Sequence, residues 1–450
     1  MLGRFDLALL FLCNLWYNVI NEENTMIINY LANPVFSISF YKVLWIINMV
    51  MVIALTVCYF NQAFHMIFSI FTRKKKYKDT DTLHKYGYII SACNEEDVIG
   101  DLIDSINNQD YPKDLMKIFV IADNCSDRTE EIAKEKGATV FIRNNKEQIG
   151  KSFALDFAVK EILKEESDIE AYFIFDADNI VDVNFTKEMN KAFDAGKEVI
   201  TGYRAPKNFN DSWLSAGSSY MYLRESRHIH HTRCRLNIGT YVSGTGYLIS
   251  SRLIKEFNGW PFHTLVEDVE ISAYLTKKNM KIAFVEDAIF YDEQPAKMRG
   301  FWRQRLRWCR GTHQVFIKEG GGLFLSLLKK PTLTKWGMFV HILPLPAITF
   351  LWFIVYTIMG LIYFLITGIA FDVYLHECLR FCAEGFLYPF AIAFIAGIIL
   401  MIECWKQIDS SWIKKIWYMI LFPVSMYFLF PATTIGLFKR VKWTPTRQLK

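Results

Sequence analysis

The chain has 450 residues, of which 52% are hydrophobic and 22% are charged. These fractions exclude a disordered chain and a collagen-like chain, and the length allows two or three domains with at least one large core. The net charge of +5 is too small to indicate nucleic-acid binding, so we expect no nucleic-acid partner. The nine cysteines include no C-x-x-C pair, which argues against a zinc ribbon and against a disulfide framework.

The first membrane candidates lie near the amino terminus. Val43–Phe60 contains 18 residues without a charge, and a run of this length crosses ~30 Å of hydrocarbon as a helix. The basic run Arg73–Lys76 follows it, and the positive-inside tendency places that flank in the cytoplasm. Leu7–Ile20 is shorter, and we interpret it as a short first span, a signal-like segment or an interfacial helix. No small-residue cleavage site follows it, which argues against a cleaved signal.

Three further apolar runs follow Lys335 and are candidate spans: Ala347–Ile369, Leu387–Ile402 and Ile416–Leu437. The last run has a basic segment on each side, Lys406–Lys415 before it and Lys439–Lys442 after it. Basic flanks tend to lie in the cytoplasm, whereas a single span would put these two on opposite sides of the membrane. Either Pro423 and Pro431 make the last run re-entrant, or Gly337–Leu345 also enters the membrane. The number and parity of the spans stay open.

Residues from about 85 to 318 have a different pattern, because charges are frequent and short β-rich runs alternate with helical ones. The pattern predicts strands at Gly87–Ala92, Lys117–Ala122, Ala138–Ile142 and Ala171–Asp176. It predicts helices at Glu95–Asn107, Thr129–Glu135 and Phe153–Glu165. Such alternation indicates βαβ units and a largely parallel sheet, in which ligands bind at the carboxyl ends of the strands.

Two aspartates follow the apolar run Phe173–Phe175. In an extended chain, Asp176 and Asp178 point the same way and present two carboxylates at a strand's end. Hard cations such as Mg²⁺ and Mn²⁺ take oxygen ligands, a few from protein and the rest from phosphate and water. This arrangement suits a nucleoside diphosphate, although two aspartates in a turn after a buried strand would give the same pattern.

Polar side chains also follow the two preceding strands. Asp123 ends the apolar run from Val120 and is placed to accept hydrogen bonds from a base or ribose, whereas Ser126 or Asp127 caps the next helix. Asn94 and Glu95 end the first strand in the same layer. The alternative for this pair is an ordinary strand-to-helix turn with Asn94 as the cap.

Charged residues also stand at the starts of two further predicted helices. Lys151 opens a helix after Gly150, where a helix amino terminus and a lysine make a phosphate site; a solvated lysine on a loop is the alternative. Glu267 and Asp268 precede the amphipathic helix Val269–Thr276. Acidic residues favour a first turn because of the helix dipole, and a carboxylate there also suits a general base on a sugar hydroxyl.

The last element is the basic and aromatic run Arg303–Trp308. Its arginines suit bidentate phosphate recognition and its tryptophan suits a sugar face, but a basic helix on an anionic membrane would look similar. The histidines His228, His230 and His231 lack a cysteine or carboxylate at matching spacing. We therefore assign them to a polar helix face rather than to zinc.

The ordered set of motifs is far more specific than any one of them. S-A-C-N-E-E, A-D-N-C-S-D, D-A-D, V-E-D and Q-R-L-R-W occur in this order at suitable intervals. The chain resembles the membrane-embedded, processive family-2 glycosyltransferases, which include cellulose, hyaluronan, chitin and poly-N-acetylglucosamine synthases. The resemblance implies an α/β fold of the GT-A type, which is Rossmann-like, in a cytoplasmic domain beside an α-helical transmembrane region of the plasma membrane.

The resemblance also implies roles for the donor-side residues. Asp123 matches the aspartate that contacts uridine, Asp178 matches the metal-binding second aspartate of D-x-D, and Asp176 holds the donor or the metal nearby. Asn94, Glu95 and Lys151 are expected to complete the nucleotide site. The implied cofactor is Mg²⁺ or Mn²⁺.

On the acceptor side, Asp268 matches the catalytic base of the T-E-D motif, with Glu267 beside it. Gln304, Arg307 and Trp308 match the Q-x-x-R-W motif, which meets the diphosphate and the acceptor end of the glycan. The loop of Gly244, Thr245 and Gly246 resembles the acceptor-side glycine loop of the family. One residue departs from the pattern, because the threonine of T-E-D is Val266 here, and this affects the orientation of the base.

The function that the resemblance implies is inverting transfer of a hexose from a UDP-sugar to a growing β-linked polysaccharide, which is exported through the membrane region. We favour a β-glucan made from UDP-glucose. The alternatives are an N-acetylglucosamine polymer made from UDP-N-acetylglucosamine and single addition to a lipid-linked acceptor. The expected partners are the donor, the nascent polysaccharide, the lipid bilayer, and a second subunit or a homo-oligomer.

The expected organisation follows from these assignments. Residues 1–72 form the amino-terminal membrane segment, 85–298 the glycosyltransferase domain, 299–335 the amphipathic interface helices with Q-x-x-R-W, and 336–450 the carboxy-terminal transmembrane helices.

Overall fold

The computed structural model describes residues 34–165, 168–367 and 371–444. The candidate segment Leu7–Ile20 lies outside these residues. The chain divides into two units, one drawn from residues 57–352 and 382–450 and the other from residues up to 56 and 353–381. In the smaller unit, helices α13 (Leu345–Thr367) and α14 (Phe371–Glu403) contribute Phe364 and Tyr374, whose rings stack with centroids 4.6 Å apart.

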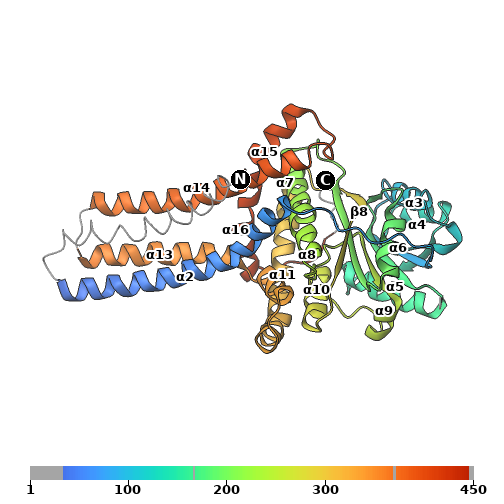
Figure 1. Ribbon diagram of the computed structural model, residues 1–450, viewed down its shortest axis with the longest axis horizontal. Coiled ribbons are helices and arrows are strands. Elements are labelled where there is room, and N and C mark those ends of the chain that lie inside the picture. The colour runs from blue at the N-terminus through green and yellow to red at the C-terminus, as the bar shows by residue number, and fades with distance from the viewer. Residues whose placement is uncertain (1–33, 166–167, 368–370, 445–450) are drawn as a thin grey trace. The chain divides into compact units, whose positions relative to one another are not determined.

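The larger unit contains an eight-stranded sheet in the order β3-β2-β1-β4-β7-β6-β8-β5. Its first four strands are parallel neighbours and confirm the expected βαβ units. They are β1 (Tyr86–Ala92), β2 (Met116–Asp123), β3 (Thr139–Arg143) and β4 (Ala171–Asp176). The helices between them are α3 (Ile99–Asn107), α4 (Thr129–Glu135) and α5 (Lys151–Glu165), and Figure 1 shows them around the strands.

The second half of the sheet is mixed and was not predicted. Strand β7 runs antiparallel to β4 and β6, β8 runs parallel to β6, and β5 runs antiparallel to β8. These strands are β5 (Ile180–Val181), β6 (Val199–Pro206), β7 (Tyr247–Ser250) and β8 (Ala283–Asp292). The carboxyl ends of β4, β6 and β8 carry the polar residues of the candidate site.

Alternate side chains of the central strand enter two separate cores. Tyr88 and Ile90 of β1 pack with α3 in one core, whereas Ile89 packs with α5 in the other. This division follows from the two-residue period of a strand. Each fully buried side chain of this size contributes about 1.5–3 kcal/mol, so both faces of the sheet hold the strand ends in fixed positions.

Further helices cover the sheet and lead to the membrane segments. They are a 3₁₀ turn η2 (Lys113–Leu115), α6 (Phe185–Asp194), α7 (Trp213–Arg224), a π-helical turn η3 (Glu225–His230), α8 (His231–Arg235), α9 (Ser251–Phe257), α10 (Glu267–Lys277), α11 (Met298–Lys329) and α12 (Leu333–Ile342). Helix α3 begins four residues later than expected, because Asn94 adopts a left-handed conformation with φ 58°.

The assignment of three histidines to a polar helix face was wrong. His228, His230 and His231 are all buried. His228 Nε2 lies 2.9 Å from Glu403 Oε2, and His231 Nδ1 lies 2.7 Å from Glu286 Oε2. Burial of a polar side chain is tolerated when it has such partners, so the cluster is part of the folded core beneath α7.

Among the described residues, four helical segments are long and apolar enough to span a membrane: Trp45–Ile70, Leu345–Leu365, Tyr374–Glu403 and Trp412–Phe438. The first belongs to α2 (Pro34–Ile70), and the last combines α15 (Trp412–Tyr427) with α16 (Leu429–Phe438). The alternative in which Gly337–Leu345 enters the membrane loses support. Helix α12 has ten residues, about 15 Å of helix, and packs on α10 and α11.

Both ends of the segment 412–438 contact the sheet-containing domain. Before it, the Asn210 side chain donates to the Asp409 carbonyl at 2.7 Å. After it, Trp443 lies against Gly150, where a side-chain carbon on the glycine would meet the indole at 3.4 Å. Arg310 also donates to the carbonyl of Gly436 at 3.2 Å. These contacts favour the re-entrant alternative, which removes the conflict between the two basic flanks.

A re-entrant segment predicts that its two flanks face the same side of the membrane. Single cysteines replacing Asp409, Thr444 and, as a reference, Lys78 would be introduced into a chain whose native cysteines are replaced. All three are expected to react with a membrane-impermeant maleimide only after the membrane is permeabilised. Labelling of Asp409→Cys and Thr444→Cys from opposite sides would show that the segment crosses.

Candidate active site

Asp178 lies in a buried cluster of like charges just beyond β4. Burial, together with the nearby carboxylates of Asp292, Asp176 and Glu95, raises the pKa of Asp178 to about 8 against the opposing effect of Lys207. A site that disfavours its own negative charge in this way is completed by a cation.

The donor atoms near Asp178 fit a hard divalent ion. The described part of the chain contains no group of three or more His, Cys, Asp or Glu side chains arranged to hold a metal. Asp292 is also engaged elsewhere, because Arg204 donates to its Oδ2. The protein therefore offers the carboxylates of Asp178 and Asp176, which suits Mg²⁺ or Mn²⁺ because these ions take their remaining oxygens from phosphate and water.

Lys151, at the start of α5, contacts acidic residues on both sides of the candidate site. Its ammonium donates to Asp176 Oδ1 and to the carbonyl of Gly244 at 2.6 Å, and it lies 3.9 Å from Glu267 Oε1. Burial alone would lower the pKa of Lys151, but Asp176 and Glu267 outweigh it and the net pKa is raised. The lysine thus stays charged and bridges two acidic groups; its contact with a donor phosphate stays a prediction.

Glu267 and Asp268 form the first turn of α10. Glu267 is 6% exposed, and burial raises its pKa to about 7. Burial also raises the pKa of Asp268, whereas the backbone amide of Val269, Lys151 and Arg307 oppose that shift. Asp268 is the less buried of the pair, so its carboxylate is the better placed to receive a proton from a bound molecule.

Val266, which departs from the T-E-D pattern, packs against helix α11. A side-chain carbon at Gly311 of α11 would lie only 2.8 Å from the Val266 methyl groups, so the valine packs closely against the helix backbone there. The hydroxyl of Thr264 donates to the Val266 carbonyl at 3.1 Å. Packing and this hydrogen bond hold the turn that begins α10.

The glycine loop 243–246 packs next to the end of β4 and hydrogen-bonds to it. Gly244 and Gly246 have φ of 80° and 67°, and a side chain on Gly246 would collide with the ring of Phe290. A carbon on Gly244 would lie 3.6 Å from Asp268 Oδ2, which places this loop next to the base. The Thr245 hydroxyl accepts from the Asp176 amide at 2.9 Å and donates to Asn179. Acceptor contacts by Gly244, Thr245 and Gly246 stay predictions.

A second cluster of polar side chains lies at the carboxyl ends of β1, β2 and β3. Asp123 is 4% exposed, and its Oδ1 accepts from Arg143 at 2.6 Å and from Asn124 at 2.9 Å. Asn94 does not cap a helix; its Oδ1 accepts from the Ser126 amide at 2.7 Å. The loops after β1 and β2 are therefore tied together. The nucleotide contacts of Asp123, Asn94 and Glu95 stay predictions.

The Q-x-x-R-W residues lie on α11. Arg307 donates to the carbonyl of Leu265 at 2.9 Å, two residues before Glu267. Gln304 Oε1 accepts from its neighbour Arg305 at 3.2 Å. Trp308 lies edge-on to Tyr222 with centroids 6.0 Å apart. Arg307 is thereby connected to the turn that begins α10, whereas the substrate contacts of Gln304, Arg307 and Trp308 stay predictions.

Arg305, which the sequence analysis grouped with the arginines suited to phosphate recognition, is instead buried and acts as a positioning residue. It is 0% exposed, and its guanidinium lies 4.4 Å from the Trp308 ring and 4.5 Å from the Phe301 ring. It donates to the Ser218 hydroxyl at 2.6 Å. Burial lowers its pKa to about 10, which leaves it charged at neutral pH. A desolvated cation held between two aromatic faces fixes the orientation of Trp308.

The pair of Arg204 and Asp292 was missed by the sequence analysis. Arg204 donates to Asp292 Oδ2 at 3.0 Å, and Asn179 donates to Oδ1 at 2.7 Å. Asp292 ends the apolar strand β8, so the pattern that revealed Asp123 and Asp176 would have found it. Arg204 lies inside β6 and gives no comparable signal.

Comparison with known proteins decides the family. Residues 84–311, half of the chain, match the family described as Glycosyltransferase like family 2. The chain belongs to this family. It is 27% identical over 258 residues to the probable glycosyltransferase YdaM of Bacillus subtilis, covering 52% of this chain and 57% of that protein.

A second relative and one solved structure agree with this assignment. The chain is 25% identical over 275 residues to the poly-β-1,6-N-acetyl-D-glucosamine synthase of Staphylococcus aureus, covering 58% of this chain and 64% of the synthase. Both matches therefore span less than two thirds of the relatives' length. The structure is similar to the mannosyltransferase PcManGT of Pyrobaculum calidifontis, with TM-score 0.51 and 16% identity, over 86% of this chain and 97% of the other. This likeness confirms the GT-A fold of the glycosyltransferase.

The buried carboxylate of Asp178 predicts a trade-off between stability and metal binding. Above the pKa of Asp178, which is about 8, Asp178→Asn removes a charge from the acidic cluster, so its Tm without metal should rise there by about 2–4 °C for each kcal/mol relieved. Mn²⁺ should raise the Tm of the wild-type glycosyltransferase but not that of the variant, as measured by thermal unfolding in detergent. Asp114→Asn, an exposed control, should behave as wild type. A full Mn²⁺ response in Asp178→Asn would exclude Asp178 as a ligand.

The contacts of Arg305 predict that it acts through Trp308. A desolvated cation–π contact is worth about 2 kcal/mol, so Arg305→Met should lower kcat/KM for UDP release about 10- to 30-fold. Combining it with Trp308→Ala should add little to the loss in the single variants. Arg303→Met, on the exposed face of the same helix, is the matched control. Additive losses would show that Arg305 serves the fold independently of Trp308.

Proposed function

We propose that the glycosyltransferase transfers N-acetylglucosamine from UDP-N-acetylglucosamine to a growing β-linked polysaccharide, with inversion at the anomeric carbon. The observation that carries the proposal is the meeting of donor-side Asp176 and base-side Glu267 and Asp268 around Lys151. A transferase needs the leaving group and the attacking hydroxyl in one place, and this arrangement supplies both sides.

The names of the relatives support N-acetylglucosamine over glucose as the transferred sugar. The sequence analysis favoured a β-glucan, with an N-acetylglucosamine polymer as an alternative. The Staphylococcus aureus relatives are named poly-β-1,6-N-acetyl-D-glucosamine synthases, and this supports the alternative. The Q-x-x-R-W residues on α11 support chain extension over single addition to a lipid-linked acceptor.

Each group has a role in a single displacement. Asp178 and Asp176 would hold Mg²⁺ or Mn²⁺, which when bound neutralises charge on the leaving diphosphate. Asp268 takes the proton of the acceptor hydroxyl as that oxygen attacks the anomeric carbon. Lys151 and Arg307 keep positive charge beside the base, and Trp308 offers a face for the terminal sugar. No covalent sugar–enzyme intermediate is required.

The membrane segments fit a synthase whose product leaves the cell. The basic run Arg73–Lys76 directly follows the candidate span Trp45–Ile70, and by the positive-inside tendency this supports a cytoplasmic catalytic domain. The protein is then a multi-pass protein of the plasma membrane. The bilayer, the polysaccharide, and a second subunit or second copy of the chain are its proposed partners.

The decisive experiment measures UDP release by the detergent-purified chain with UDP-N-acetylglucosamine or UDP-glucose, each with Mn²⁺. The product is digested with linkage-specific glycosidases. Turnover with UDP-N-acetylglucosamine to a polymer is expected, and Asp268→Asn should lose at least about 100-fold in kcat, the usual scale of general-base catalysis. Polymer from UDP-glucose alone would replace the sugar assignment, and one-sugar products would favour single addition.

The environment of Asp268 predicts a pH dependence. A general base works only when deprotonated, and the raised pKa of Asp268 means that the rate rises with pH through a midpoint above the ordinary aspartate value of ~3.9. Arg307 lowers the pKa of Asp268, so Arg307→Met should move this midpoint to higher pH. The measurement is kcat between pH 5 and 9 with saturating donor, and Arg303→Met is the control. An unmoved midpoint would contradict the coupling.

A further inference from the structure

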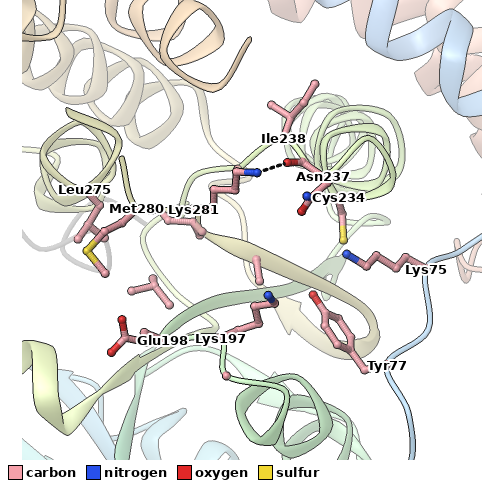
Figure 2. A pocket seen from close by; sticks show the side chains of 15 residues that line it. Lys75, Tyr77, Lys197, Glu198, Cys234, Asn237, Ile238, Leu275, Met280 and Lys281 are labelled. Atoms are coloured by element: carbon pink, nitrogen blue, oxygen red, sulfur yellow. Dashed lines mark hydrogen bonds between the residues drawn. The ribbon is translucent and has the colours of Figure 1, made fainter. Parts of the chain in front are cut away.

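A cavity lies at the opposite ends of β6 and β8 from the candidate active site. Val199 and Ala283, which begin these parallel strands, line it, whereas Arg204 and Asp292 lie toward the far ends. Its volume is about 240 Å³. Figure 2 shows Lys75, Tyr77 and Lys197 around it. It is therefore separate from the residues assigned to donor and acceptor.

Three lysines from three parts of the chain enter this cavity. Lys75 follows α2, Lys197 precedes β6 and Lys281 precedes β8. The ammonium of Lys281 donates to the Asn237 carbonyl at 2.9 Å, as Figure 2 shows. Three positive side chains that are distant in sequence but share one cavity repel one another unless an anion lies between them.

No carboxylate among the residues that the structure describes pairs with Lys75 or Lys197. Within the described ranges, neither Lys75 nor Lys197 forms an ion pair, although both are half-buried. Glu198 also lines the cavity, but its two oxygens accept from Arg252 at 2.5 and 2.6 Å, and in Figure 2 its carboxylate points away from the two lysines. The cavity thus retains net positive charge.

The position of Lys75 sets it apart within its basic run. Arg73, Lys74 and Lys76 are exposed, whereas Lys75 is half-buried and lines the cavity. Its ammonium lies 5.6 Å from the ring of Tyr77. Burial raises the pKa of the Tyr77 phenol, so the hydroxyl keeps its proton and acts as a donor. Figure 2 shows the ends of Lys75, Tyr77 and Lys197 directed toward a common space.

We propose that this cavity binds a phosphate group that does not belong to the sugar donor. Two ammonium groups and a phenol hydroxyl offer charge and donors to an anion with several oxygens, which is the chemistry of phosphate. The phosphate has two sources. Lys75 lies five residues beyond the end of α2 at Ile70, within reach of an anionic lipid headgroup, and the cavity is also open to a soluble phosphate compound.

The test uses the detergent-purified full chain and two double variants of equal charge change. Lys75→Gln with Lys197→Gln removes the two cavity lysines, and Lys76→Gln with Lys78→Gln removes two exposed lysines of the same segment. One arm titrates inorganic phosphate and follows Tm. The other adds phosphatidylglycerol or phosphatidylcholine and counts retained lipids by native mass spectrometry.

The wild-type chain and the exposed-lysine control should respond to at least one probe, and the cavity variant should bind that probe at least about tenfold more weakly. Retention of one phosphatidylglycerol, but no phosphatidylcholine, would identify a lipid headgroup as the source. A Tm rise with inorganic phosphate alone would identify a soluble ligand. Equal binding by the cavity variant and wild type, or no response of wild type to either probe, would overturn the proposal.

Discussion

The ammonium of Lys151 is the contact on which the arrangement of the site depends. It lies between Asp176 at the end of β4 and Glu267 at the start of α10, and it holds the Gly244 carbonyl as well. Removing Lys151 would leave the buried carboxylate of Glu267 without its partner cation. The lysine therefore sets the distance between the donor side and the base side.

Residues around this centre hold its parts in place. The buried pair Arg204 and Asp292 fixes the ends of β6 and β8, and Arg204 also donates to the Ser243 carbonyl at 3.0 Å. Glu225, in the π-helical turn, accepts from the Ser243 hydroxyl at 2.5 Å. The glycine loop is thus supported from two sides. Preorganisation of this kind allows charged groups to act without rearranging during the reaction.

The parallel half of the fold was predictable because its signals are local. Apolar runs that end in aspartate revealed β2 and β4 and hence Asp123 and Asp176, and the predicted bounds differ from the observed ones by no more than one residue. The family assignment also followed from ordered motifs. The roles carried over with those motifs remain predictions that the structure makes testable.

The second half of the fold gave weaker signals. Strand β7 pairs with β4 across more than seventy residues, and no local pattern reveals such a partner. The buried histidines were misjudged for the same reason, because Glu286 is 55 residues from His231. Sequence also did not indicate that Lys151 bridges carboxylates or that Arg305 lies between two rings.

The most direct test of the central contact is a double-mutant cycle on Lys151 and Asp176, with kcat/KM for UDP release as the readout. Lys151→Met, Asp176→Asn and the double variant would be compared with wild type, and Lys160→Met, on the exposed face of α5, would be the control. If Lys151 works through Asp176, the double variant should lose about as much activity as the worse single variant. Losses that simply add would show that the two residues act independently and would contradict the account.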